Sequence, residues 1–224
     1  MRQIACIGGD SEEYAVRLLR FVLETSGKAQ PSLLFVPTAQ GDRQELIDNF
    51  CDAASAFAQV SVLTTFPWPP ANLRELVFDQ DVIFVSGGST ANMLAIWRVH
   101  GIDLLLREAW DRGIVLSGVS AGMVCWFECG VTDSFGPQLE SMDGLGFLPG
   151  SACPHYDSED RRRPRYQQLI SEGLPEGLAV DDDVVVRFVE TKLREVVTCR
   201  SDAAAYRVRT TGEERLEPRL LADP

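Results

Sequence analysis

Short apolar runs alternate along the chain with longer segments whose apolar residues recur at helical spacing. The short runs are continuous, which is typical of strands in a parallel sheet covered on both faces. The predicted strands are Ile4–Ile7, Leu33–Val36, Val60–Leu63, Val82–Val85 and Ile114–Leu116. The spacing between them predicts helices over 11–25, 43–58, 89–99 and 101–111, a short helix or turn over 72–77 and a helix start within 120–128. This alternation predicts an α/β fold.

The pattern changes after about residue 180. The stretch VVVRFVETKLREVV is typical of a hairpin with Glu190-Thr191-Lys192 at its turn. Residues 201–217 suggest a further strand, and a polar tail follows. The sequence contains no internal repeat, low-complexity tract or interdomain linker, and its 224 residues are 45% apolar. We therefore expect a single α/β domain over residues 1–224.

The charge of the chain narrows its range of partners. A net charge of −12 repels phosphate backbones, so nucleic acid is not expected as a partner. No apolar run approaches the roughly 18–20 residues that a membrane span needs. The first ten residues, MRQIACIGGD, lack the pattern of a signal peptide. We expect a cytoplasmic protein with no membrane partner.

The cysteines give no sign of a metal site. All six are scattered, no CxxC pair occurs, and the chain has only two histidines. This spacing does not suit zinc, and we expect reduced thiols and no bound metal.

The strongest chemical signal is GVSAG at residues 118–122, which follows the predicted strand Ile114–Leu116. A strand, a GxSxG turn and a helix together form a nucleophile elbow, in which the serine hydroxyl stands clear of the sheet. Ser120 would then lie at a helix N-terminus, where free N–H groups favour an oxyanion. The alternative is that Ser120 only caps a helix.

A serine nucleophile needs a base, usually histidine. His100 ends an amphipathic segment just before Gly101, where a cationic side chain is an ordinary structural feature. His155 lies in the polar loop SACPHYDSED, after the glycine-rich GLGFLPG. His155 is therefore the candidate base, against the alternative of a surface or structural histidine.

Several carboxylates can orient the imidazole. Asp133, in the turn-prone GVTDSFG, lies between the serine and the histidine in sequence and is the first choice. Glu128 and Glu140 are further options. The cluster Asp181-Asp182-Asp183 follows a probable strand and is either a source of the carboxylate or a solvated turn.

Two other segments can contribute to such a site. Glycines in Ser86-Gly87-Gly88-Ser89 allow a backbone N–H to approach a substrate closely, and the loop lacks the lysine of a phosphate-binding P-loop. The basic run 161–165, RRRPR, can supply an arginine to a substrate carboxylate, or it can simply start a surface helix.

Taken together, VSGGST, GVSAG, CWFECGVTDSFG and GFLPGSACPHYD resemble the peptidase E (aspartyl dipeptidase) and cyanophycinase family of serine peptidases, and most closely its peptidase E-like branch. The resemblance runs from the first strand to about residue 200. It implies a three-layer α/β sandwich with a mostly parallel sheet, flavodoxin-like and related to class I glutamine amidotransferases. It also implies a homodimer.

The resemblance implies roles for individual residues. Ser120 falls on the nucleophile, His155 on the general base and Asp133 on the family's loop aspartate. A second acidic position, a glutamate in peptidase E, falls near Asp182. The oxyanion donors fall on the N–H groups of Gly88 and Ala121. The substrate-binding arginine falls on Arg162 or Arg163.

The expected function is hydrolysis of short peptides by a serine exopeptidase that needs no cofactor. The loop SEDRRRPRYQ is shorter than in aspartyl dipeptidase, which argues against strict specificity for N-terminal aspartate. An esterase or amidase with the same site, or a noncatalytic small-molecule binding domain, are the alternatives.

Overall fold

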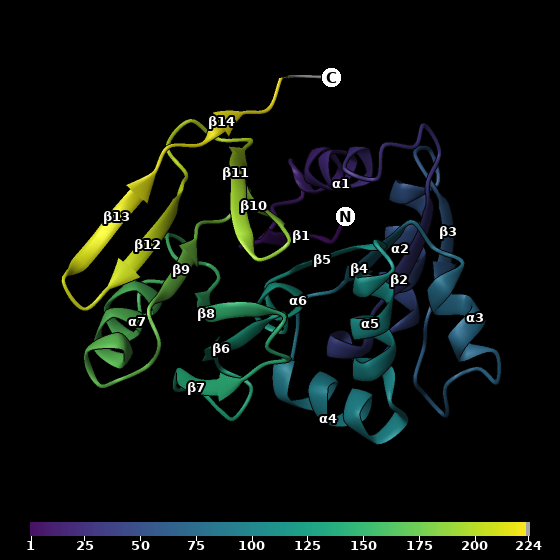
Figure 1. The fold of residues 1–224 in the computed structure, drawn as a ribbon, viewed down its shortest axis with the longest axis horizontal. Helices are drawn as coiled ribbons and strands as arrows, with labels where there is room; N and C mark the ends of the chain where they lie inside the picture. The colour runs from purple at the N-terminus through teal and green to yellow at the C-terminus, as the bar shows by residue number, and fades with distance from the viewer. Residues whose placement is uncertain (223–224) are drawn as a thin grey trace.

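The computed structural model describes residues 1–222 and contains two sheets (Figure 1). The larger has eight strands in the order β14-β11-β10-β1-β5-β4-β2-β3. Five of them run parallel: β1 (Gln3–Ile7), β2 (Ser32–Val36), β3 (Gln59–Val62), β4 (Val82–Val85) and β5 (Val115–Val119). The predicted strands are all present, within a few residues of their expected ends.

The remaining strands of this sheet come from the C-terminal part of the chain. Strands β10 (Val184–Val189) and β11 (Lys192–Thr198) form the predicted hairpin, and β10 pairs antiparallel with β1. The short strand β14 (Arg219–Leu220) pairs with β11 at the edge of the sheet. The hairpin thus extends the parallel sheet beyond its first strand.

Helices cover both faces of the larger sheet. One face packs against α1 (Ala15–Glu24) and α2 (Gln44–Ala54), and the other against α3 (Leu73–Phe78), α4 (Thr90–His100) and α5 (Ile102–Asp111). Successive strand residues alternate between these cores: Phe35 and Phe84 face α1 and α2, whereas Val36 and Val85 face α4. Burial on both faces explains why the strands are continuous apolar runs in sequence.

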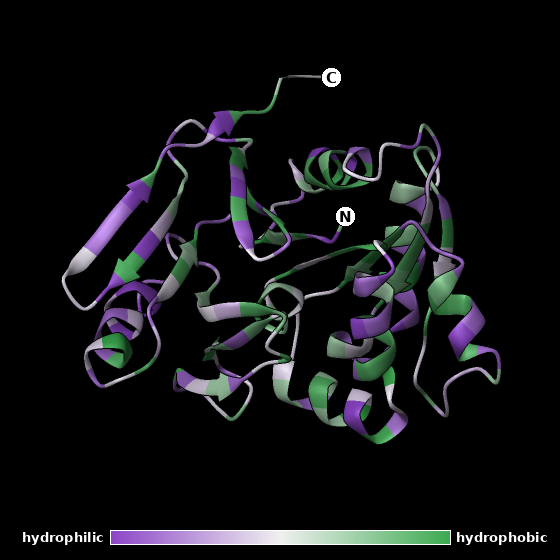
Figure 2. Ribbon diagram, in the orientation of Figure 1, coloured by the Kyte–Doolittle hydropathy of each residue, from purple (hydrophilic) through white to green (hydrophobic). Residues whose placement is uncertain are grey.

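The second sheet was not predicted from the pattern. Its six strands run in the order β13-β12-β9-β8-β6-β7. They are β6 (Phe127–Thr132), β7 (Glu140–Asp143), β8 (Leu148–Cys153), β9 (Gly177–Val180), β12 (Ala205–Arg209) and β13 (Gly212–Leu216), and α7 (Arg162–Ser171) packs on them. In Figure 2 β13 is largely hydrophilic, consistent with its exposed position at the edge of the sheet.

The helix expected within 120–128 is much shorter than its pattern suggests. Helix α6 spans only Ala121–Val124, and the chain enters β6 at Phe127. Trp126 and Phe127 are both buried, one in the turn and one in the strand. A short run that is apolar on all sides fits a buried helix or a buried strand equally well, so its periodicity could not identify the change.

The two sheets share one hydrophobic core. Phe127 of β6 packs edge-on against Phe188 of β10, with ring centroids 5.8 Å apart. Trp126 packs near Trp97 of α4 and Phe147, which joins the second sheet to the helices of the first. This shared core favours the predicted single domain, which stays a prediction.

We predict that Phe127→Ala destabilises both sheets together. Removing a buried phenylalanine side chain costs about 3–5 kcal/mol of unfolding free energy, because a cavity is left between the sheets. Chemical denaturation followed by tryptophan fluorescence and by far-ultraviolet circular dichroism should give one coincident transition, at lower denaturant than for the wild type. Two separate transitions would show that the sheets fold as independent units.

Candidate active site

Ser120 lies in a sharp turn between β5 and α6. Its backbone has φ 54° and ψ −109°, a conformation that residues with a side chain rarely adopt. The Ser120 N–H donates to the Ile7 carbonyl of β1, 3.1 Å away, and the Ser120 carbonyl accepts from Met123 and Val124. The turn therefore fixes the serine at the carboxyl end of the parallel sheet, as a nucleophile elbow does.

The glycines on either side of Ser120 allow this turn because backbones meet there. A Cβ atom on Gly118 would lie 2.5 Å from the Gly122 carbonyl oxygen. A Cβ atom on Gly122 would lie 2.3 Å from the carbonyl oxygen of Val85, in β4. The spacing GxSxG is thus a packing requirement of the β5–α6 turn against β4.

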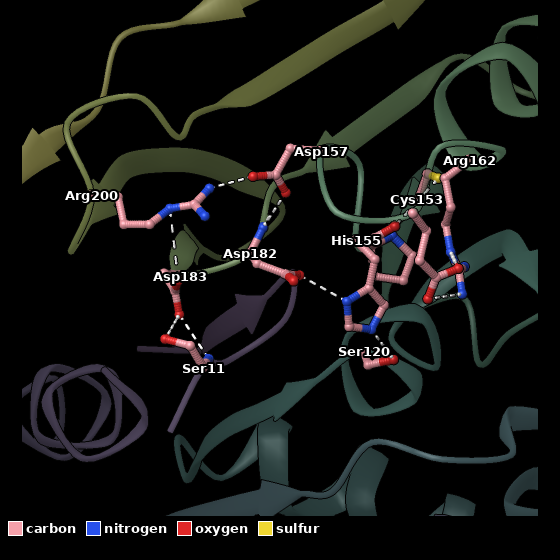
Figure 3. Close-up of polar contacts among 11 residues, drawn as sticks. Ser11, Ser120, Cys153, His155, Asp157, Arg162, Asp182, Asp183 and Arg200 are labelled. Carbon is pink, nitrogen blue, oxygen red and sulfur yellow. Dashed lines mark hydrogen bonds and ion pairs between the residues drawn. The ribbon is translucent and has the colours of Figure 1, made fainter. Parts of the chain in front are cut away.

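A chain of hydrogen bonds runs from Ser120 through His155 to Asp182 (Figure 3). The Ser120 Oγ atom lies 2.9 Å from His155 Nε2, and His155 Nδ1 lies 2.7 Å from Asp182 Oδ1. Since the ionised Asp182 carboxylate can only accept a hydrogen bond, it favours the neutral imidazole tautomer with its proton on Nδ1, which leaves Nε2 as an acceptor for the serine hydroxyl. This is the order of groups that activates a serine nucleophile.

The carboxylate that contacts His155 is the sequence alternative and not the first choice. Asp133 follows β6 in an exposed position and lines a pocket together with Ser120 and His155, but it is Asp182 that contacts the imidazole. Asp182 reaches His155 because the connection between β9 and β10 passes beside the loop after β8. This contact joins residues 27 apart in sequence, and local spacing could not reveal it.

The other two alternatives lie elsewhere. Glu128 projects from β6 and its Oε2 atom accepts the Gly150 N–H at 2.8 Å. Glu140 is an exposed residue at the start of β7. Both belong to the second sheet, away from the imidazole.

A network of charged side chains holds the loop that carries Asp182. The Asp157 carboxylate accepts the Asp182 N–H at 2.9 Å and forms an ion pair with Arg200. Arg200 Nε also lies 3.7 Å from Asp183, whose carboxylate accepts both the N–H and the hydroxyl of Ser11 at 2.8 and 2.9 Å. Figure 3 shows these contacts on the side of Asp182 that faces away from His155. The acidic cluster is therefore anchored and not a free solvated turn.

Gly9 leaves room for the His155–Asp182 pair. A Cβ atom at this position would lie 1.9 Å from Asp182 Oδ1 and 2.5 Å from His155 Nδ1. The Gly9 carbonyl accepts the N–H of Asp183 at 2.8 Å, which brings the loop after β1 against the aspartates. Any larger residue at position 9 would displace the pair.

The aspartates differ in electrostatics. Burial acts to raise the pKa of Asp182, but hydrogen bonds from His155 and Ser158 and the nearby charges of His155 and Arg200 outweigh it, so the pKa lies below its ordinary value. Burial raises the pKa of Asp181 to about 6, against a hydrogen bond from the Ala204 N–H. Asp182 therefore stays ionised beside His155 near neutral pH.

Two backbone amides next to Ser120 are free to bind an oxyanion. The loop after β4 carries Gly87 and Gly88, and Ala121 is the first residue of α6. Across residues 1–222 the amides of Gly88 and Ala121 have no hydrogen-bond acceptor. Gly88 has φ 126°, and a Cβ atom there would lie 2.2 Å from the Ala39 carbonyl oxygen, so the loop conformation depends on glycine.

The two candidate arginines point to different places. Arg162 is buried and lines the pocket that contains Ser120 and His155. Its guanidinium donates to the Glu159 carboxylate at 2.8 Å and to the Val131 carbonyl at 3.2 Å. Arg163 instead pairs with Glu213 and lies over the rings of Tyr156 and Tyr206, outside this pocket.

The remaining sequence candidates are not at the site. His100 is exposed at the end of α4, where Gly101 adopts the left-handed conformation. All six cysteines are free thiols. In residues 1–222 no group of three or more His, Cys, Asp or Glu side chains is placed to hold a metal ion, and no helix is long and apolar enough to cross a membrane.

Sequence reasoning missed Gly9, Ser11, Asp157 and Arg200. Asp157 is two residues after His155, so its place in the same polar loop was a signal. Gly8-Gly9-Asp10 follows the first strand, but its spacing does not fit a nucleotide-binding loop, so it indicated no role at the site. Ser11 and Arg200 carried no local signal, because the contact of Ser11 with Asp183 spans 172 residues and that of Arg200 with Asp157 spans 43.

Comparison with known proteins identifies the relatives of this chain. The profile of Peptidase family S51 matches residues 4–196. A Bacillus subtilis (strain 168) protein named "Uncharacterized peptidase YgaJ" is 46% identical over 222 residues, covering 97% of this chain and 96% of that protein.

Solved structures share the fold at low sequence identity. A peptidase from an acI-B1 Actinobacterium is similar with a TM-score of 0.71 and 19% identity, covering 97% of this chain and 95% of that one. A candidate peptidase E protein from Listeria monocytogenes EGD-e is similar with a TM-score of 0.65 and 18% identity, covering 97% of this chain and 100% of that one. These likenesses support the predicted flavodoxin-like α/β sandwich.

We predict that Ser120→Gly is more stable than Ser120→Ala. Both variants lose the hydroxyl, but only alanine keeps a Cβ atom in the strained conformation at φ 54°. Such strain costs about 1–3 kcal/mol, and the greater freedom of unfolded glycine offsets about 0.5–1 kcal/mol of it. Urea unfolding should show a higher midpoint for the glycine variant. Equal midpoints would mean that the turn imposes no more strain than the greater freedom of unfolded glycine offsets, about 0.5–1 kcal/mol.

Proposed function

The chain belongs to peptidase family S51, and we propose that it is a serine exopeptidase that hydrolyses short peptides through an acyl-enzyme on Ser120. The observation that carries this proposal is the hydrogen-bond chain from Ser120 through His155 to Asp182. A strained elbow that presents the serine, with two free amides beside it, supports the same chemistry.

In the proposed mechanism, Ser120 Oγ attacks the carbonyl carbon of the scissile bond. His155 Nε2 takes the hydroxyl proton, and Asp182 stabilises the imidazolium through Nδ1–H. The Gly88 and Ala121 N–H groups donate to the oxyanion of the tetrahedral intermediate. His155 then gives the proton to the leaving amine as the C–N bond breaks, which leaves the acyl-enzyme. Water attacks this ester with His155 again as the base, the bond to Ser120 Oγ breaks, and the carboxylic acid product is released.

Charged groups beside Ser120 support an exopeptidase. Arg162, Glu159 and Asp133 line a polar pocket that also contains Ser120 and His155. A short peptide carries a charge at each end, and such a pocket can bind one terminus and place the next bond at the serine. We propose Arg162, and not Arg163, as the substrate-binding arginine. A substrate carboxylate that binds there would have to share Arg162 with Glu159. The homodimer and the cytoplasmic location stay predictions.

We predict that Ser120→Ala abolishes both covalent labelling and turnover. Loss of the nucleophile should lower kcat by at least about 10⁴-fold, while the fold is retained. The wild type and the variant are incubated with a fluorophosphonate probe and with a panel of di- and tripeptides, and the products are identified by mass spectrometry.

Labelling and peptide cleavage by the wild type alone would support the proposal, and single residues or dipeptides among the products would identify an exopeptidase. Labelling without cleavage of any peptide would point to an esterase or amidase. Full activity of Ser120→Ala would show that the nucleophile is another residue.

We predict that Asp182→Asn and Asp133→Asn differ sharply. An asparagine at 182 can leave the imidazole in the wrong tautomer, which lowers kcat by about 10³–10⁴-fold. An asparagine at 133 leaves the His155–Asp182 contact intact, so kcat should stay within about 10-fold of the wild type, well short of the roughly 10²–10⁴-fold that general base catalysis contributes. The measurement is the steady-state kcat of both variants on one cleaved peptide. A larger loss of kcat in Asp133→Asn than in Asp182→Asn would assign the orienting role to Asp133.

A further inference from the structure

A second cleft lies on the other side of Ser120 from the polar pocket. Its volume is about 530 Å³, and Ser120, His155, Gly87 and Gly88 all line it. It lies where the strand order reverses: from β2 the chain passes outward to β3 and then returns to β4 on the other side of β2. In open α/β sheets such switch points, at the carboxyl ends of the strands, are the usual places for ligands.

The walls of this cleft are mainly apolar and partly aromatic. Phe35 of β2 and Phe50 of α2 stack with ring centroids 3.8 Å apart, and Phe84 of β4 lies 5.3 Å from Phe50. Further apolar side chains come from α1, α2 and the end of β5, namely Val16, Leu46 and Val119. Phe35 and Phe84 are buried in the sheet while Phe50 is half-buried, so the aromatic wall is fixed by the core.

The charges around the cleft disfavour an acidic occupant. Asp10 and Glu12 line it, and within the described chain no lysine or arginine does. The arginine that lines the polar pocket, Arg162, already pairs with Glu159. An apolar side chain would gain binding free energy by packing against the walls of the cleft. A carboxylate would instead lose its hydration and be repelled by Asp10 and Glu12.

We propose that this cleft binds an apolar side chain, aromatic or large aliphatic, of the substrate residue that adjoins the scissile bond, and that it sets the specificity of the enzyme. The proposal rests on the serine peptidase function proposed above. We take the occupant to be part of the substrate because Ser120, His155 and the Gly87-Gly88 loop line the same cleft. A cleft of this size holds a phenylalanine or leucine side chain.

The test compares peptides that differ only in the residue on one side of the cleaved bond. Phenylalanine and leucine are compared with serine and aspartate, first on the amino side of the bond and then on the carboxyl side. On one of the two sides, kcat/KM should be about 10- to 100-fold higher for the apolar residues, the range that burying a few carbon atoms in a pocket provides. Aspartate should be the poorest of the four.

A pair of matched variants connects this preference to the cleft. Ala53 of α2 lines the cleft and is exposed, so Ala53→Phe fills space without disturbing the core. Ala56, just past the end of α2, is equally exposed but does not line it, so Ala56→Phe is the control. Ala53→Phe should cut kcat/KM for the phenylalanine peptide by about 10-fold or more. Ala53→Phe should leave kcat/KM for the serine peptide near the wild-type value. The control Ala56→Phe should change kcat/KM for neither peptide.

Three results would overturn the proposal. If peptides are cleaved but no side shows an apolar preference, the cleft does not set specificity, and the serine peptidase function stands. If the preference exists but Ala53→Phe leaves it unchanged, another surface sets it. If neither labelling nor cleavage occurs in the wild type, the proposed function itself fails, and this inference fails with it.

Binding to the inactive variant gives a readout that does not depend on turnover. Calorimetric titration of Ser120→Ala with phenylalanine amide and serine amide should show tighter binding of the phenylalanine compound. The difference should disappear in Ser120→Ala/Ala53→Phe. Equal affinities for the two amides in Ser120→Ala would count against the cleft as an apolar subsite.

Discussion

The hydrogen-bond chain Ser120–His155–Asp182 joins two sheets, and the site depends on how those sheets dock. Ser120 directly follows β5 of the parallel sheet, His155 follows β8 of the second sheet, and Asp182 lies on the connection that returns from the second sheet to the first. The shared core around Phe127 and Phe188 holds them in register. A shift of about 1 Å between the sheets would break a contact of 2.7 or 2.9 Å, and such misplacement can cost about 100-fold in rate.

Backbone strain collects at the same place. Ser120, His155 and Asp183 all have positive φ, at 54°, 53° and 63°. Such conformations persist only where the surroundings fix them. Here close backbone contacts around Gly118, Gly122 and the loop after β1 fix the serine and the aspartates, while the Asp157–Arg200 pair holds the loop from outside. In these conformations the serine hydroxyl and the imidazole face each other, 2.9 Å apart.

The two sides of Ser120 differ in chemistry. Toward the second sheet, the polar pocket offers Arg162 with its partner Glu159. Toward α1 and α2, the cleft offers stacked phenylalanines with two carboxylates and no cation in its described lining. Both sides lie at the carboxyl ends of the parallel strands and share Gly88, Ser120 and His155 in their lining. A peptide bound across Ser120 would therefore meet a charged surface on one side and an apolar surface on the other.

The sequence by itself determined the local features. Continuous apolar runs identified the parallel strands, and GVSAG after such a run identified the elbow, because both depend on residues within one turn or strand of each other. The motifs likewise pointed to the family and to Ser120 and His155. Only the tertiary structure decided the orienting carboxylate and the separate directions of Arg162 and Arg163. It also decided the break of the 120–128 segment into a short helix and a strand. Each of these depends on contacts between residues distant in sequence, and a carboxylate 27 residues from its histidine has no local pattern that sets it apart from one 22 residues before it.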